Sequence, residues 1–271
     1  PGFPAHPHRG FETVTVVRKG LLDHSDSLGA AARYGEGDVQ WLTAGSGIQH
    51  AEMFPLLNAR ADNPLELFQI WLNLPRSKKL VAPHFSMLWA GSIPNVQHRD
   101  LHGRLTDVSL RAGSLGSVHA PPPAPNSWAA SNDNEVAIWT IRMAPKAQWT
   151  LPLAARGLSR SLYLFRGASI LAGDQAVRVG HVLGLNSGMP LLLENGDLEA
   201  ELLLLQGRPI GEPLARRGPF VMNTELEIRQ AYSDFRETQF GGWPWPSSDP
   251  VHGAGVERFA KRPDGTVERP G

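Results

Sequence analysis

Short apolar runs separated by turn residues recur along the whole chain. Runs of about 4–8 residues between Gly, Pro and Asp are typical of strands in an all-β sandwich or barrel. Val14 and Val16 alternate with Thr13 and Thr15, so the two kinds of side chain project from opposite faces of one strand. The pattern therefore predicts an all-β protein. The runs are Thr13–Val17, Val39–Leu42, Leu67–Leu72, Val136–Ile141, Leu162–Phe165 and Leu198–Leu205.

One helix interrupts this pattern near the C-terminus. Thr224 and Glu227 have the spacing of a capping box, with Thr224 as the N-cap. Gly241 and Gly242 would end the helix. We expect this helix to cover a sheet, because its apolar residues share one face. They are Ile228, Ala231, Tyr232 and Phe235.

A proline-rich segment near the middle divides the chain into two comparable halves. Residues 120–127 read APPPAPNS, and consecutive prolines favour an extended connector over a central strand. An insertion loop within one domain is the alternative interpretation. We expect domains at residues 1–118 and 135–242, joined by a linker at 119–134 and followed by an extended tail at 243–271. Trp243 and Trp245 could fasten this tail to a barrel.

Composition and charge narrow the function classes. The chain has 271 residues, 26 Lys and Arg, 26 Asp and Glu, and no cysteine. A net charge of zero gives no overall attraction to nucleic acid or an anionic membrane, so we expect neither partner. No apolar run approaches the roughly 20 residues that span a bilayer. The sequence thus predicts a cytoplasmic protein, which we expect to be a monomer.

Two pairs of polar residues carry the candidate chemistry. His6 and His8 are two residues apart, as are His50 and Glu52, and residues at this spacing share one face of a strand. On adjacent strands the two pairs would offer three nitrogens and one oxygen to a metal ion. Without thiolates, such ligands suit iron(II), manganese, cobalt, nickel, copper or zinc. Four unrelated surface residues are the alternative interpretation.

The segments around these pairs resemble the pirin family, a branch of the cupin superfamily. Residues 4–14 (PAHPHRGFETV) are similar to the family's signature, and residues 37–53 (GDVQWLTAGSGIQHAEM) to its second block. Residues 218–224 (GPFVMNT) and the helix after them resemble its C-terminal block. These blocks are long and nearly ungapped, and the resemblance covers most of the chain.

The resemblance implies a fold and a site. Pirins are bicupins, with two cupin barrels (jelly-roll, or double-stranded β-helix) packed face to face. The N-terminal barrel holds the metal, usually iron, which makes His6, His8, His50 and Glu52 the expected ligands. Ordinary cupins often take their carboxylate from the first motif, which leaves Glu12 as an alternative ligand or as a residue that orients a ligand. The family has several strands before the metal motif, so we expect the first barrel to be incomplete here.

An internal alignment of the two halves predicts a second barrel without metal. Leu153 and Ala155 fall opposite His6 and His8, while Leu193 and Asn195 fall opposite His50 and Glu52. The remaining histidines lack a histidine or glutamate partner two residues away, and we expect His24 to be solvated in a polar loop. We expect Trp41 and Trp71 in the core. The other histidines without an assigned role are His84, His98, His102, His119, His181 and His252.

Three functions follow from the resemblance. Some pirins resemble quercetin 2,3-dioxygenases, which implies a flavonol substrate, dioxygen, and Glu52 as the candidate catalytic base. The alternative is a non-catalytic, metal- or redox-dependent module that binds a protein partner and regulates transcription or a metabolic enzyme. The third is a metal-stabilised structural protein without turnover.

Overall fold

The computed structural model describes all residues, 1–271, and consists mostly of strands. The chain divides into two compact units. The first unit contains Pro1–Ser92, Pro123–Trp128 and Ile210–Gly271, and the second contains Ile93–Pro122 and Ala129–Pro209. Each apolar run named above overlaps a strand, so the predicted all-β class is confirmed.

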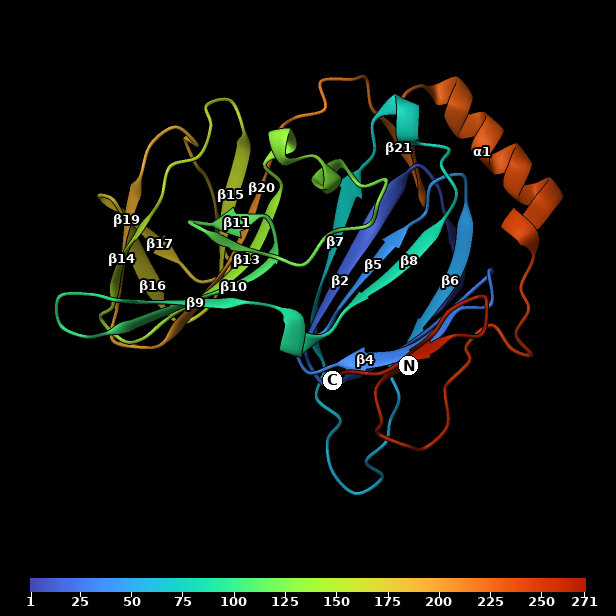
Figure 1. Cartoon of the computed structure of the whole chain (residues 1–271), viewed down its shortest axis with the longest axis horizontal. Coiled ribbons are helices and arrows are strands. Elements are labelled where there is room, and N and C mark those ends of the chain that lie inside the picture. Colours follow the sequence, from blue (N-terminus) through green and yellow to red (C-terminus); the bar gives the residue numbers. More distant parts are fainter. The chain divides into compact units, whose positions relative to one another are not determined.

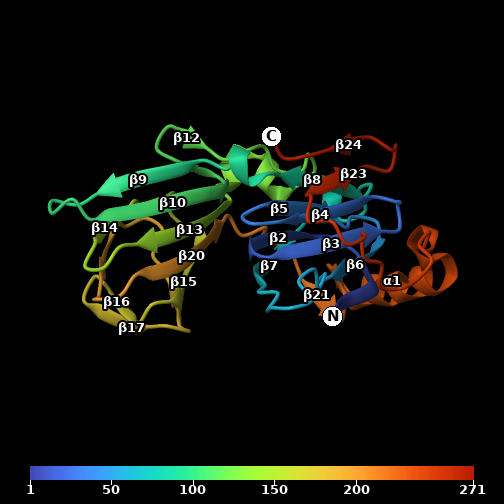
Figure 2. The ribbon, with the colours of Figure 1, turned by 90° about the horizontal axis from the view of Figure 1, so that it is seen from below.

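Two antiparallel sheets build the first unit. One has six strands in the order β1-β6-β3-β4-β23-β24, and the other has four in the order β7-β2-β5-β8. Figure 1 shows the four-stranded sheet with its strands side by side, and Figure 2 shows β23 beside β4. The strands of this unit are β1 Gly2–His8, β2 Phe11–Lys19, β3 Leu21–Asp26, β4 Ala31–Gly35, β5 Val39–Thr43, β6 Ile48–Met53, β7 Glu66–Asn73, β8 His84–Leu88, β21 Ala215–Arg217, β22 Phe220–Met222, β23 Phe259–Lys261 and β24 Val267–Glu268.

The second unit repeats this plan. A six-stranded sheet has the order β18-β15-β20-β13-β10-β9, and a four-stranded sheet has the order β14-β19-β16-β17. Trp139, Leu162 and Leu202 are among the buried residues of its apolar core. Its strands are β9 Asn95–Arg99, β10 Leu105–Ala112, β11 Ser114–Leu115, β12 Val118–His119, β13 Ala137–Met143, β14 Gln148–Leu151, β15 Ser159–Arg166, β16 Ser169–Ala172, β17 Gln175–Arg178, β18 Val182–Gly184, β19 Leu191–Asn195 and β20 Ala200–Gly207.

The helix α1, Glu225–Thr238, begins at the predicted capping box. The Thr224 hydroxyl accepts from the Glu227 backbone N–H, and the Glu227 side chain accepts from the Thr224 backbone N–H. Ile228 and Ala231 are buried against the hairpin of β21 and β22, so the helix covers this small sheet (Figure 1). Five short 3-10 helices complete the structure, at Arg76–Lys78, Ala90–Ser92, Trp128–Ala130, Asn132–Asn134 and Gln239–Gly241.

The division of the chain differs from the expected boundaries at its C-terminal end. Residues 210–242, which the sequence placed in the second domain, belong to the first unit. The physical reason is visible in the hydrogen bonds. The Val221 N–H donates to the Arg9 carbonyl, and the Lys79 ammonium donates to the Val221 carbonyl. The Lys79 ammonium also donates to the Gly10 carbonyl, so both bonds connect β22 to the loop between β1 and β2.

The linker also differs from a free connector. Pro123–Trp128 packs with the first unit, and the Ser127 hydroxyl donates a hydrogen bond of 2.5 Å to the buried Glu12 carboxylate. In the tail, the Trp245 indole N–H donates to the Asp26 carbonyl at 2.8 Å, whereas the Trp243 indole N–H donates to the Ser247 carbonyl of the tail itself. No helix of the structure is long and apolar enough to cross a membrane.

Candidate metal centre

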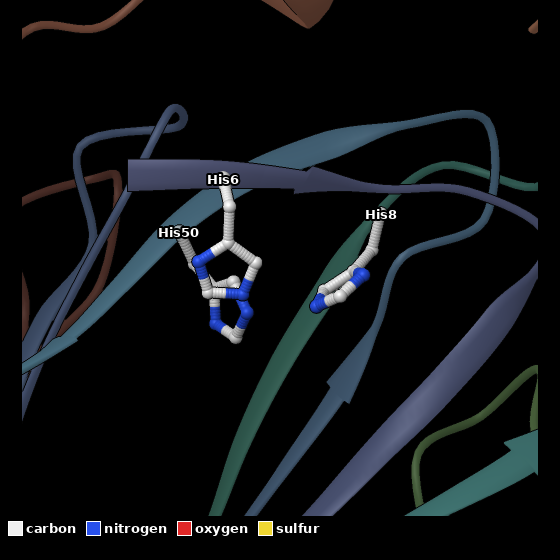
Figure 3. A group of neighbouring side chains, drawn as sticks. All are labelled: His6, His8 and His50. Carbon is white, nitrogen blue, oxygen red and sulfur yellow. The ribbon is translucent and has the colours of Figure 1, made fainter. Parts of the chain in front are cut away.

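Three histidines from two paired strands meet inside the first unit. His6 and His8 lie on β1 and His50 lies directly opposite His6 on β6. Because His6 and His8 are two residues apart, both rings project from the same face of β1. One ligand nitrogen from each ring lies within 4.8 Å of the others. Figure 3 shows the three imidazoles projecting to the same side of the two strands.

The free ring nitrogens are those that an ion would need. The His6 Nδ1 lies 2.8 Å from the Pro4 carbonyl, and the His8 Nδ1 lies 3.3 Å from the Pro219 carbonyl. A carbonyl oxygen only accepts hydrogen bonds, so each Nδ1 must carry the proton and each Nε2 keeps its lone pair. The His8 Nε2 and both ring nitrogens of His50 are buried without a hydrogen-bond partner.

Burial keeps the His8 and His50 rings neutral. It lowers the pKa of His8 to about 3, assisted by the neighbouring His6 and opposed by the hydrogen bond to Pro219. The pKa of His50 is likewise well below its usual value, because burial and the neighbouring histidines disfavour its charged form. Neutral imidazoles with orphaned lone pairs are the donor set of a transition-metal site. The residues therefore fit a divalent metal ion.

Glu52 lies beside this cluster. Its Oε2 is 3.9 Å from the His50 Nε2, and only 1% of the residue is exposed. Ligands about 2.1 Å from one ion lie roughly 3–4 Å apart, so this separation is compatible with a shared ion. Glu12 lies elsewhere. Its carboxylate accepts from the hydroxyls of Thr43 and Ser127, and neither Glu12 nor Glu52 is among the residues of the histidine cluster itself.

A pocket of about 280 Å³ opens onto the cluster. Two aromatic side chains line this pocket and are partly exposed: 55% of Phe3 and 38% of Trp71 are exposed. The prediction that Trp71 belongs to the core is therefore wrong, whereas Trp41 is fully buried as expected. Trp71 packs one face against Phe11, with ring centroids 4.3 Å apart. The lining residues are Phe3, His6, His8, Glu52, Gln69, Trp71, Gly218 and Pro219.

The prediction for His24 is also wrong. It is fully buried on β3, its Nε2 lies 3.1 Å from the Asp26 carboxylate, and its ring centroid is 5.6 Å from that of His50. His24 and Asp26 are two residues apart on one strand. The spacing argument used for His6 and His8 could thus have found this pair.

Two further residues of the site, Gln69 and Thr15, have no recognisable signal in the sequence. They lie opposite each other on β7 and β2, and both donate to the Glu52 carboxylate. Neither belongs to a motif with a chemical meaning of its own. Only the pairing of these strands brings them to Glu52.

In the second unit, the positions aligned with His50 and Glu52 have other roles. Leu193 is fully buried in the apolar core. The Asn195 amide donates to the carbonyls of Met143, Ala144 and Leu198. Its amide nitrogen is therefore occupied in fixing the backbone.

Two barrels of this kind, with histidines gathered in the first, define a bicupin. Residues 1–72 match the family model described as Pirin, and residues 138–241 match that of the Pirin C-terminal cupin domain. The chain is 37% identical over 239 residues to a candidate quercetin 2,3-dioxygenase of Pseudomonas aeruginosa, covering 88% of this chain and 79% of that protein. It is 32% identical over 248 residues to pirin of Homo sapiens, covering 89% and 78%.

A solved structure supports the same conclusion. The crystal structure of a quercetin 2,3-dioxygenase from Acinetobacter baumannii superposes with a TM-score of 0.77 at 30% identity, covering 89% of this chain and 80% of that one. The chain belongs to the pirin family.

Proposed function

We propose that this pirin-family bicupin holds one divalent transition metal, iron(II) in the first instance, through His6, His8, His50 and Glu52. We further propose that it is a dioxygenase acting on flavonols such as quercetin. The observation that carries the proposal is the pocket: it joins the metal donors to the partly exposed aromatic side chains of Phe3 and Trp71. The likeness to the Acinetobacter baumannii enzyme supports the choice of substrate class.

We assign separate roles to the residues of the pocket. Phe3 and Trp71 would hold a flat aromatic ring by apolar and edge contacts. Glu52 would receive the proton of the substrate's hydroxyl group on a carboxylate oxygen. A bound metal would supply Lewis acidity and stabilise the deprotonated oxygen. The buried neutral histidines would keep that charge in a region of low polarity, where its electrostatic stabilisation is strongest.

Oxygen uptake by protein loaded anaerobically with iron(II) tests this function. We expect uptake when quercetin is added, and loss of both iron and uptake in His50→Ala. His102→Ala is the matched control, because this histidine lies exposed in the turn between β9 and β10. It should keep the iron content and the rate. A reaction without protein corrects for autoxidation of quercetin.

The alternative outcome has a clear meaning. No uptake from protein shown to contain iron would exclude quercetin turnover and favour the metal-dependent interaction module. Full metal content in both His8→Ala and His50→Ala would instead overturn the ligand assignment.

A further inference from the structure

The Glu52 carboxylate is held by two donors from the opposite sheet. The Gln69 side-chain amide donates to Oε2 at 2.7 Å, and the Thr15 hydroxyl donates to Oε1 at 3.3 Å. Glu52 itself lies on β6, in the sheet that carries the three histidines, whereas Gln69 and Thr15 lie on β7 and β2. The carboxylate therefore bridges the metal donors and a separate pair of hydrogen-bond donors.

The orientation of the Gln69 amide follows from its neighbour. The Trp71 indole N–H can only donate a hydrogen bond, and it lies 3.4 Å from the Gln69 Oε1. This contact assigns the oxygen to the Trp71 side and directs the amide nitrogen toward Glu52. Gln69 is exposed and lines the pocket with Trp71. A molecule that enters the pocket thus reaches the residue that holds Glu52.

Burying a carboxylate without a hydrogen-bond or ion-pair partner costs free energy, and only 1% of Glu52 is exposed. If Glu52 left the metal and no hydrogen-bond donor lay nearby, its negative charge would remain buried in the barrel without a partner. Gln69 and Thr15 would remove this obstacle, because their hydrogen bonds to the carboxylate do not depend on a metal. The same Oε2 that lies 3.9 Å from the His50 Nε2 is the one that Gln69 holds.

We propose that Gln69 is a positioning residue that retains the Glu52 carboxylate when an aromatic diol or enol displaces it from the metal. This inference rests on the proposed metal site. It assigns the pocket to ligands with two adjacent oxygens, since such a chelator would need a second coordination position, which the departure of Glu52 would supply. A Glu52 that has left the metal also has a lone pair available for the proton of the incoming hydroxyl.

Anaerobic binding of catechol to cobalt-loaded protein tests the role of Gln69 without turnover. The variant Gln69→Met keeps the length of the side chain and removes the donor. The control Gln148→Met makes the same change at another cross-strand pair, where the Gln148 amide donates to the Glu194 carboxylate in the second unit. The visible absorption of cobalt(II) reports its coordination, and competition with a chelator gives its affinity.

We expect the dissociation constant of catechol to rise about tenfold in Gln69→Met, the effect of one hydrogen bond to a charged group. The affinity for cobalt should be unchanged, and the catechol-induced change in absorption should appear at correspondingly higher concentration. Gln148→Met should behave as the wild type. A fall of roughly 10–100-fold in cobalt affinity with unchanged catechol binding would overturn the inference, because Gln69 would then only support a permanent ligand.

Identical behaviour of Gln69→Met and wild type would also overturn it, as would a cobalt-loaded wild type that binds no catechol. Neither result depends on oxygen uptake. If the catechol results are as expected but the protein consumes no oxygen with quercetin, the proposed role of Gln69 stands and the proposed dioxygenase activity is overturned.

Discussion

The chemical role of a histidine in this protein is set by what its two ring nitrogens meet. In His6 and His8 a backbone carbonyl accepts a hydrogen bond from Nδ1 and leaves Nε2 free, whereas in His24 the Asp26 carboxylate engages Nε2 and leaves Nδ1 free. All of these side chains lie on β1 or β3. Residue type and spacing are therefore equivalent, and the hydrogen-bond partner decides which nitrogen of each ring keeps a free lone pair.

Glu12 is a second residue whose role depends on its surroundings, and it gives a prediction about pH. Burial raises its pKa from 4.5 to about 7, opposed by hydrogen bonds from Ser127 and Thr43 and by the charge of Lys78. Between these two pH values the folded state binds more protons than the unfolded state, so stability falls as pH rises. Glu12→Gln removes the ionisation.

We therefore expect Glu12→Gln to gain free energy of unfolding relative to wild type as pH rises from 5 to 8, by up to about 3 kcal/mol. Urea unfolding of the first unit at the two pH values, at equal metal content, measures this difference. A constant difference between the two proteins would contradict the raised pKa.

At the scale of elements, the C-terminal segment holds both strands that carry the histidine cluster. Arg9, which follows His8, donates to the Asp234 carboxylate at 2.6 Å and lies over the Phe240 ring at 4.5 Å. The Gln49 amide, next to His50, donates to the carbonyls of Gln239 and Gly242. The helix α1 and the turn after it thus fix β1 and β6 from outside.

The N-cap of α1 is the part of this segment that the sequence specified most fully. We expect Thr224→Ala to lower the free energy of unfolding by about 1 kcal/mol, because the Glu227 backbone N–H loses its acceptor. Ser233→Ala is the matched control, since it removes an exposed hydroxyl from the helix interior, where alanine has the higher helix propensity. Urea unfolding compares the two variants, and equal losses would argue against a role for the cap.

At the scale of the whole molecule, the chain leaves the first unit and returns to it. The C-terminal tail is bound to β3 and β4 by side chains as well as by strand pairing. The Arg33 guanidinium, which forms a buried ion pair with Asp23, donates to the carbonyls of Gly253 and Gly255, and β23 pairs with β4. His252 adds a contact of 2.7 Å with the His24 carbonyl.

A chain that ends at Gly242 should therefore be destabilised in the first unit alone. We expect amide hydrogen exchange in β3 and β4 to accelerate on the order of tenfold or more, since several hydrogen bonds are lost. Exchange in β13 and β20 of the second unit should stay as in the full chain. Mass spectrometry of peptides from both units provides the comparison, and equal acceleration in the two units would contradict this prediction.

The sequence by itself determined the strands, the capped helix and the candidate ligands. These features are local: alternation over a few residues defines a strand, and a two-residue spacing places His6 with His8 and His50 with Glu52 on shared faces. The long segments that resemble the pirins further implied that the two motifs contribute to one site. The role of Trp245 in fastening the tail was also foreseeable, because burial of an aromatic side chain is favourable in free energy.

Tertiary structure alone decided the rest. Gln69 and Thr15 reach Glu52 only through the pairing of β7 with β2, and Pro219 reaches His8 from more than 200 residues away. Trp71 lies in an apolar run like a core residue, but the local pattern does not distinguish a side chain inside the barrel from one that lines the pocket. Residues 210–242 follow the second barrel in sequence but pack with the first unit, because the hydrogen bonds between β22 and the loop after β1 join distant parts of the chain.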